Sequence, residues 1–165
     1  MARKCFYSFH YRPDNWRVAQ VKNMGVVEGQ PIISGNDWEE VKKGGDAAIQ
    51  KWIDNNLYGR SCVIVLVGTT TASRRWVKYE IKKGWDEGKG VLGVRIHNIL
   101  DREQRKSVAG PSPFEVVTVG VDKKPLSTWA KLYNPPHTDS QKVYAYIAEH
   151  LESWVETAIK IRKSV

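Results

Sequence analysis

The stretch that decides the predicted fold is residues 61–88, SCVIVLVGTTTASRRWVKYEIKKGWDEG. It opens with Cys62–Val67, a continuous β-branched and aliphatic run whose length fits a strand buried on both faces, as strands are in parallel sheets. Gly68 and three threonines then interrupt this run. Residues 72–83 lack glycine and proline, begin near a capping serine or threonine, and are followed by glycine. The stretch therefore predicts a strand, a polar crossover and a helix.

A functional rim is expected where this strand ends. In open α/β sheets, ligands bind outside the carboxyl ends of the strands, where loops and helix N-termini converge. Residues 69–73 should lie there. Residues three, four and seven apart share one face of a helix, so Ser73, Trp76 and Glu80 are expected in line. This pattern places a carboxylate near an indole at the edge of a predicted pocket.

The composition predicts one packed domain, residues 1–165. This length is usual for a single domain, and a 41% hydrophobic share with seven tryptophans fits a sizeable core. Cys5 and Cys62 both lie in apolar runs, which favours buried thiols over a disulfide or a metal site. We find no signal-peptide pattern and no apolar run of membrane-spanning length. We therefore expect a soluble, reduced, cytoplasmic protein without membrane partners.

The charge balance favours anionic ligands without choosing among them. The chain has 26 Lys and Arg against 18 Asp and Glu, a net charge of +8. The basic residues are dispersed in pairs and form no long stripe of the kind that follows a nucleic acid. Nucleic-acid binding would rest on charge alone, so we do not expect it.

The rest of the chain alternates between strands and helices. Asp14 is expected to cap a helix after a break at Pro13. Residues 26–43 suggest one short strand and a long irregular loop, and residues 101–108 a short helix or turn. Further strands are expected at residues 4–9, 91–96 and, at an edge, 115–119; further helices at residues 15–23, 45–57 and 139–161; and irregular structure at residues 123–137.

These elements predict a doubly wound α/β fold with a mostly parallel five-stranded sheet in the order 2-1-3-4-5. The common catalytic and nucleotide fingerprints are absent from the sequence. We find no GxGxxG after the first strand, no GxxxxGK[ST] loop, no CxxC or HExxH cluster and no GxSxG. We therefore expect no metal site.

Three segments together carry a family resemblance: Tyr7-Ser8-Phe9 at the end of the first strand, the buried strand Cys62–Val67, and Ser73-x-x-Trp76-x-x-x-Glu80 after it. With these, the whole chain resembles TIR domains, and in particular the TIR-like domain of the ThsB family of bacterial antiphage Thoeris systems. The resemblance implies a flavodoxin-like three-layer sandwich. It also implies cleavage of NAD, in some members with cyclisation of ADP-ribose into a signal that activates a partner effector.

The resemblance carries the catalytic role onto Glu80 and the substrate pocket onto Ser8, Phe9, Tyr11 and Trp76. Beside these we place the rim residue Ser73, a lid residue Trp38, and two arginines that can hold an anion, Arg74 and Arg75. NAD is then the substrate and no separate cofactor is needed. We predict an enzyme that releases nicotinamide and makes a cyclic ADP-ribose isomer as an antiphage signal. Self-association and a phage-derived trigger are further expectations.

Each of these assignments has a plainer alternative. Glu80 can be a solvated glutamate paired with Lys78 or Lys83, and Trp76 can be a core residue. Trp38 can pack its own loop, and the two arginines can form a solvated helix face. His10 and His97 are better explained by structural roles than by catalysis. The alternative function is a non-catalytic TIR-type module that only assembles with other proteins.

Overall fold

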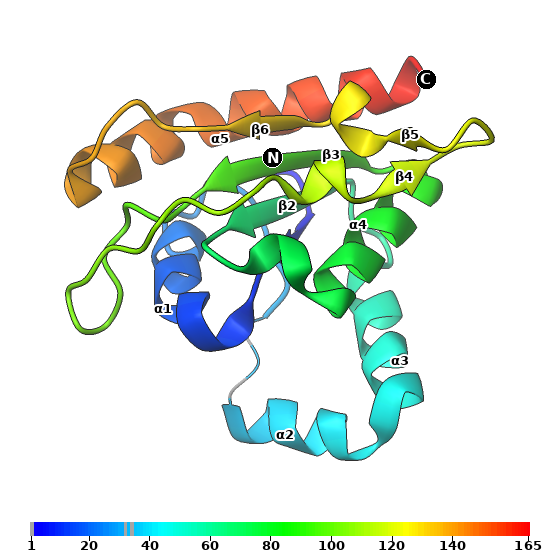
Figure 1. Ribbon diagram of the computed structural model, residues 1–165, viewed down its shortest axis with the longest axis horizontal. Helices are drawn as coiled ribbons and strands as arrows, with labels where there is room; N and C mark the ends of the chain where they lie inside the picture. The colour runs from blue at the N-terminus through cyan, green and yellow to red at the C-terminus, as the bar shows by residue number, and fades with distance from the viewer. Residues whose placement is uncertain (1, 32, 34) are drawn as a thin grey trace.

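A computed structural model describes residues 2–31, 33 and 35–165 of the chain. Its centre is a parallel sheet with the strand order β1-β2-β3-β6. Helices cover both faces of this sheet, which gives three layers (Figure 1). The strands are β1 (Cys5–Ser8), β2 (Cys62–Val67), β3 (Gly90–Arg95) and β6 (Lys131–Tyr133).

The central strand β2 is buried along its whole length, as predicted. Its alternate side chains divide the core into two halves. Cys62, Ile64 and Leu66 face helices α1 (Tyr11–Lys22) and α5 (Ser140–Lys163). The three valines between and after them face helices α3 (Gly45–Leu57) and α4 (Arg75–Asp86). The run of aliphatic residues thus contacts one helical layer on each side.

Shorter elements complete the chain. Helix α2 (Gly35–Lys43) buries none of its residues and packs beside α3, away from the sheet (Figure 1). A small hairpin, β4 (Thr118–Val119) with β5 (Lys124–Pro125), packs on the α4 side of the core. The 3₁₀ turns are η1 (Thr71–Ser73), η2 (Pro113–Glu115) and η3 (Leu126–Thr128). No helix of the described residues is long and apolar enough to cross a membrane.

The predicted fold class is confirmed, but the described residues form four strands in the main sheet where we predicted five. The missing strand was expected within residues 26–43, where Ile32 lies outside the described residues. In place of that strand, the structure has one isolated parallel β-bridge, between Lys4 and Glu28, at the outer edge of β1. Beyond it the side-chain amide of Gln30 accepts from the N–H of Tyr7 and donates to its carbonyl, both at 2.8 Å. A side chain thus makes the bonds that a neighbouring strand would make.

The last strand was also predicted in the wrong place. Residues 115–119 do not join the main sheet; Thr118–Val119 pairs antiparallel with Lys124–Pro125 in the small hairpin. The edge of the sheet is instead β6, in a segment that we predicted to be irregular. Its strand pattern is only three residues long and is hidden by the prolines that follow it.

Two helix predictions need correction as well. Pro13 does not break the chain before α1 but lies in its first turn, where the missing N–H costs nothing. Asp14 is not the cap; it is buried, and its Oδ1 accepts from Arg17 at 2.9 Å. Residues 35–43 are helical rather than a loop. Residues 101–108 contain a turn, one of the two forms predicted for them. Cys5 and Cys62 are buried free thiols, as predicted.

Gly84 allows α4 to lie close to β2, because a Cβ at this position would lie 2.5 Å from Cγ2 of Val63. Gly84→Ala should therefore destabilise the protein, since overpacking a core costs about 1–3 kcal/mol and outweighs the gain of roughly 1 kcal/mol in helix propensity. In a Val63→Ala background the same change should be stabilising, because the methyl group fills the space left by the valine. Urea unfolding of the four variants measures this reversal. A destabilisation of equal size in both backgrounds would contradict it.

Candidate active site

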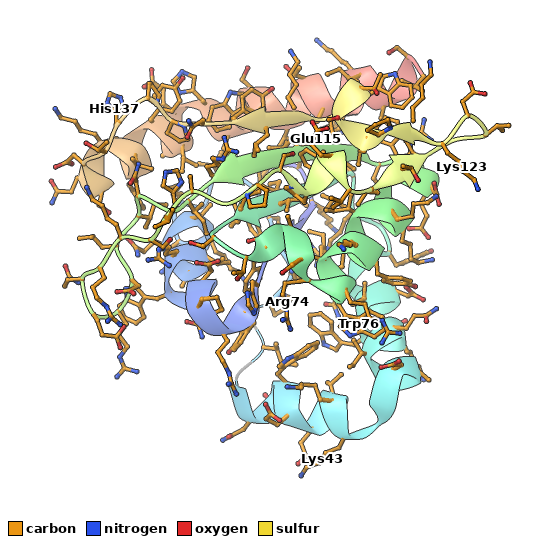
Figure 2. All side chains as sticks on the ribbon, in the orientation of Figure 1. Lys43, Arg74, Trp76, Glu115, Lys123 and His137 are labelled. Atoms are coloured by element: carbon orange, nitrogen blue, oxygen red, sulfur yellow. The ribbon has the colours of Figure 1, made fainter. Side chains whose placement is uncertain are left out.

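A cavity of about 910 Å³ lies beyond the carboxyl end of β1, between the start of α4 and helix α2. Figure 2 shows Arg74 and Trp76 on the side of α4 that faces α2. Residues from five segments line this cavity, including Phe9, His10, Tyr11, Arg12, Gln30, Trp38, Lys42, Trp52, Arg74, Arg75, Trp76 and Glu80. The position agrees with the general rule that ligands bind at the carboxyl edge of such sheets.

Glu80 is the buried acid of this cavity, with a fractional exposure of 8%. It lies one helical turn before Gly84, on the part of α4 that packs against the sheet. Its Oε1 accepts a hydrogen bond of 2.6 Å from Oγ of Ser8, the last residue of β1. Burial raises the pKa of Glu80 to about 8, although the bond from Ser8 acts in the opposite direction. At neutral pH the carboxyl group of the ligand-free protein is therefore mostly protonated.

This geometry excludes the solvated alternative for Glu80. Lys83 pairs with Asp54 and Glu87 instead, at 3.9 and 3.2 Å. Lys78 forms no ion pair with any residue that the structure describes. Ser8 is fully buried and lies behind Glu80, outside the cavity lining. The predicted substrate contact of Ser8 is therefore replaced by a positioning role, in which its hydroxyl group orients the carboxyl group.

Aromatic pairs form much of the cavity wall. Phe9 and Tyr11, near the end of β1, have ring centroids 6.1 Å apart. Trp38 of α2 meets Trp52 of α3 edge to face at 5.5 Å, so the predicted lid residue does line the cavity, from a helix rather than a loop. Trp76 lines it from α4 and is half-buried rather than a core residue. Such faces can pack against the planar rings of a ligand.

The two predicted arginines have different surroundings. Arg75 pairs with Asp46 at 2.9 Å, and its guanidinium lies 4.6 Å from the ring centroid of Trp76. Arg74 precedes α4 as its N-cap and forms no ion pair within the described part of the chain. Arg12, which we did not predict, also lines the cavity and is likewise without a carboxylate partner among the described residues. Arg12 and Arg74 are thus the cations available for an anionic ligand.

Ser73, like Ser8, is a predicted site residue that does not line the cavity. The chain makes the 3₁₀ turn η1 before α4 begins, so Ser73 is not in helical line with Trp76 and Glu80. It is exposed, and its Oγ donates to the carbonyl of Thr70 at 2.9 Å. His10 has a structural role at the rim. Its Nδ1 lies 2.8 Å from Oγ1 of Thr70, and this hydrogen bond connects the loops after β1 and β2.

Several residues that line the cavity were not predicted from the sequence. Arg12 could have been found, because it directly follows Tyr11, a predicted pocket residue. Gln30, Lys42 and Trp52 gave no signal in the sequence. Lys42 and Trp52 reach the cavity through the packing of α2 and α3, and Gln30 is placed by its hydrogen bonds with the backbone of Tyr7. Among the described residues, no group of three or more His, Cys, Asp or Glu side chains could hold a metal ion.

The parallel sheet, the two helical layers and the carboxylate at the rim define a flavodoxin-like domain of the TIR-like class. Residues 6–101 match the family described as "Thoeris protein ThsB, TIR-like domain", and the chain belongs to this family. It is also 34% identical over 120 residues to a Bacillus cereus (strain MSX-D12) protein named "Putative cyclic ADP-D-ribose synthase ThsB1". That match covers 70% of this chain and 62% of the relative.

Glu80→Gln should stabilise the protein at alkaline pH. The folded state holds the Glu80 proton more tightly than the unfolded state, so the wild type loses stability as the pH rises from about 4 to about 8. The glutamine variant does not share this loss. The difference in melting temperature should therefore grow by several degrees between about pH 5 and about pH 9.

Glu87→Gln is the matched control for this measurement, because Glu87 is the C-cap of the same helix and its side chain is exposed rather than buried. Its free energy of unfolding should differ from that of the wild type by no more than about 0.5 kcal/mol at each pH, so its melting temperature should follow that of the wild type. A difference between Glu80→Gln and the wild type that stays constant from pH 5 to pH 9 would show that the burial does not perturb Glu80.

Proposed function

We propose that this domain cleaves NAD at the bond between nicotinamide and ribose and closes the ADP-ribose into a cyclic isomer. The observation that carries the proposal is Glu80, a buried carboxyl group in the wall of a cavity that also offers aromatic faces and unpaired arginines. The name of the Bacillus cereus relative, "Putative cyclic ADP-D-ribose synthase ThsB1", supports the same reaction class. NAD acts as the substrate.

The reaction needs a negative charge beside the ribose, where positive charge develops. When the glycosidic bond breaks, nicotinamide leaves with the electron pair and becomes neutral, while positive charge develops on the ribose carbon and ring oxygen. The ionised carboxylate of Glu80 can stabilise this charge, as carboxylates do in glycoside hydrolysis. A hydroxyl group or adenine nitrogen of the same ADP-ribose then forms the new bond to the carbon. Where a hydroxyl group attacks, its proton is released to solvent.

The other cavity residues have roles that follow from their chemistry. Arg12 and Arg74 can bind the two phosphates of the substrate. The aromatic faces of Trp76, Phe9 and Tyr11 can pack against its rings and exclude water. Exclusion of water favours the internal nucleophile, because a well-oriented group of the same molecule reaches an effective molarity of about 10⁵–10⁸ M. The proposed product is therefore a ring rather than linear ADP-ribose.

The cellular role that we propose follows from this product. A cyclic ADP-ribose isomer is small and diffusible, so it can act as an antiphage signal that activates a separate effector protein. We further propose that a phage-derived trigger or self-association controls the activity. The alternative function, a non-catalytic TIR-type interaction module, gives no reason for Glu80, because a buried carboxyl group with one hydroxyl partner destabilises the fold and contributes nothing to a docking surface.

Incubation of the purified domain with NAD tests the proposal. We expect free nicotinamide, and by mass spectrometry a product lighter than ADP-ribose by one water. The value of kcat/KM should rise with pH and level off above about pH 8, because the ionised form of Glu80 is required. Glu80→Gln should abolish nicotinamide release, whereas the exposed control Glu87→Gln should retain it.

The domain should be assayed both alone and with lysate from phage-infected cells, since a trigger belongs to the proposal. Full activity of Glu80→Gln under conditions that activate the wild type would refute the role of Glu80. A product that is almost entirely linear ADP-ribose would refute cyclisation and leave a hydrolase. No nicotinamide under either condition would support the interaction module.

A further inference from the structure

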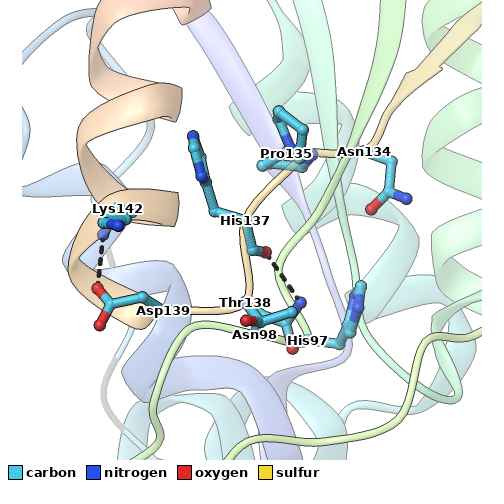
Figure 3. Close-up of a pocket in the computed structure, with 9 residues that line it drawn as sticks. His97, Asn98, Asn134, Pro135, His137, Thr138, Asp139 and Lys142 are labelled. Carbon is cyan, nitrogen blue, oxygen red and sulfur yellow. Dashed lines mark hydrogen bonds between the residues drawn. The ribbon is translucent and has the colours of Figure 1, made fainter.

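A second cavity, of about 420 Å³, lies at the carboxyl ends of β3 and β6 (Figure 3). It shares no lining residue with the candidate active site. Figure 3 shows the side chains of His97, Asn98, Asn134 and His137 around it, with Lys142 of α5 at its border. The family resemblance and the proposed reaction do not account for this cavity.

The walls of this cavity are held in place by hydrogen bonds within the protein. Nδ2 of Asn98 donates to the carbonyl of His137 at 3.2 Å and so joins the segments that follow β3 and β6 (Figure 3). The N–H of Leu100 donates to Oγ of Ser140 at 3.0 Å, a second link between the same parts. Because these segments are already held in place, they lose little conformational entropy when a ligand binds.

The charged groups around the cavity favour an anion. Lys142 forms no ion pair with the residues that the structure describes. Asp139 also lines the cavity, but its Oδ1 is already engaged as the cap of α5, where it accepts from the backbone N–H of Lys142 at 3.0 Å. Burial lowers the pKa of the His97 imidazole, and the nearby cations Arg95 and Arg17 lower it further. Of these two, Arg17 is paired with Asp14 and Asp101, at 2.9 and 3.7 Å. Nδ1 of His97 is enclosed and has no hydrogen-bond partner in the described structure.

A row of aromatic rings ends at the cavity; its last contact, between Tyr146 and His137, is edge to face. From Tyr133 the row runs through Trp154, His150 and Tyr146 to His137, with centroid separations of 4.3, 5.6, 4.0 and 5.7 Å. His137 is the terminal ring of this row and also lines the cavity. A planar heterocycle can therefore extend the row by packing against His137, as nucleobases do on aromatic and histidine side chains.

We propose that this cavity is a binding site for a nucleoside monophosphate, distinct from the candidate active site. The base packs against His137 at the end of the ring row, and the phosphate binds Lys142. Oδ1 of Asn98, whose Nδ2 is engaged by His137, and the amide group of Asn134 are available to the polar edge of the base or to the ribose. This proposal does not depend on the reaction proposed for Glu80.

Titration of the ¹⁵N-labelled domain with AMP tests the site by NMR. AMP should produce saturable shifts in the signals of Asn98, Asn134 and Thr138, apart from any shifts around the large cavity. Lys142→Ala and His137→Ala should each weaken binding at these signals by about tenfold, the effect of losing one charge-assisted bond or one stacked ring. Lys160→Ala, an exposed lysine further along the same helix, and Arg74→Ala in the large cavity are the controls and should leave this affinity unchanged.

Two probes separate the parts of the ligand. Adenosine, which lacks the phosphate, and inorganic phosphate, which lacks the base, should each bind at these signals more weakly than AMP. An adenosine affinity equal to that of AMP would overturn the role of Lys142, and an equal phosphate affinity would overturn that of His137. Shifts confined to residues of the large cavity, or an AMP affinity unchanged in the Lys142→Ala and His137→Ala variants, would overturn the site itself.

Discussion

The hydrogen bond between Ser8 and Glu80 is the interaction on which the candidate active site depends. It joins the end of β1 to the middle of α4, and it forms inside the protein, where an acid without a cationic partner is costly. Three features of the fold make it possible. β1 pairs with β2 so that Ser8 lies opposite Val65, Gly84 lets α4 approach β2, and the η1 turn starts α4 at Arg75. Small changes in any of them would move the carboxyl group.

Protonation follows from this arrangement. Because Glu80 has one hydroxyl partner and little contact with water, it favours the neutral form near pH 7. Without a ligand, the protein is therefore more stable with Glu80 protonated than with Glu80 ionised. A cationic ligand beside Glu80 would instead favour the carboxylate. The site is thus suited to a substrate that carries positive charge where the acid lies. The nicotinamide ring of NAD meets this requirement, which connects the geometry to the proposed reaction.

Much of the fold could be predicted because the pattern of β2 is strong. An uninterrupted aliphatic run, a polar crossover and then residues 72–83 without glycine or proline leave few alternatives, and α3 and α5 have clear helical periodicity. The outer edge of β1 could not be predicted, since Gln30 makes the bonds of a strand with a side chain and leaves no strand pattern. The short strand β6 was missed for a similar reason, because its partner β3 and the core around it define it more than its own sequence does.

In the candidate site, too, some residues could be predicted from the sequence and others could not. Glu80 and Trp76 could be found from their spacing after a buried strand, and Phe9 and Tyr11 from their place at the end of β1. The burial of Glu80 could not be predicted, because it depends on the packing of α4 against β1 and β2. Ser73 was assigned wrongly since the spacing argument assumed one continuous helix, whereas the chain makes a tight turn first. Arg12 and Lys42 lie at the cavity only because α1 and α2 begin where they do.

The measurement that tests this account most directly is the titration of the Glu80 carboxyl carbon by NMR, with the signal assigned by its absence in Glu80→Gln. It requires no substrate, trigger or partner. The account predicts a midpoint near pH 8, well above the ordinary glutamate value of about 4.3. A midpoint at that ordinary value would show that Glu80 is solvated, and it would contradict both the buried geometry and the chemistry proposed for it.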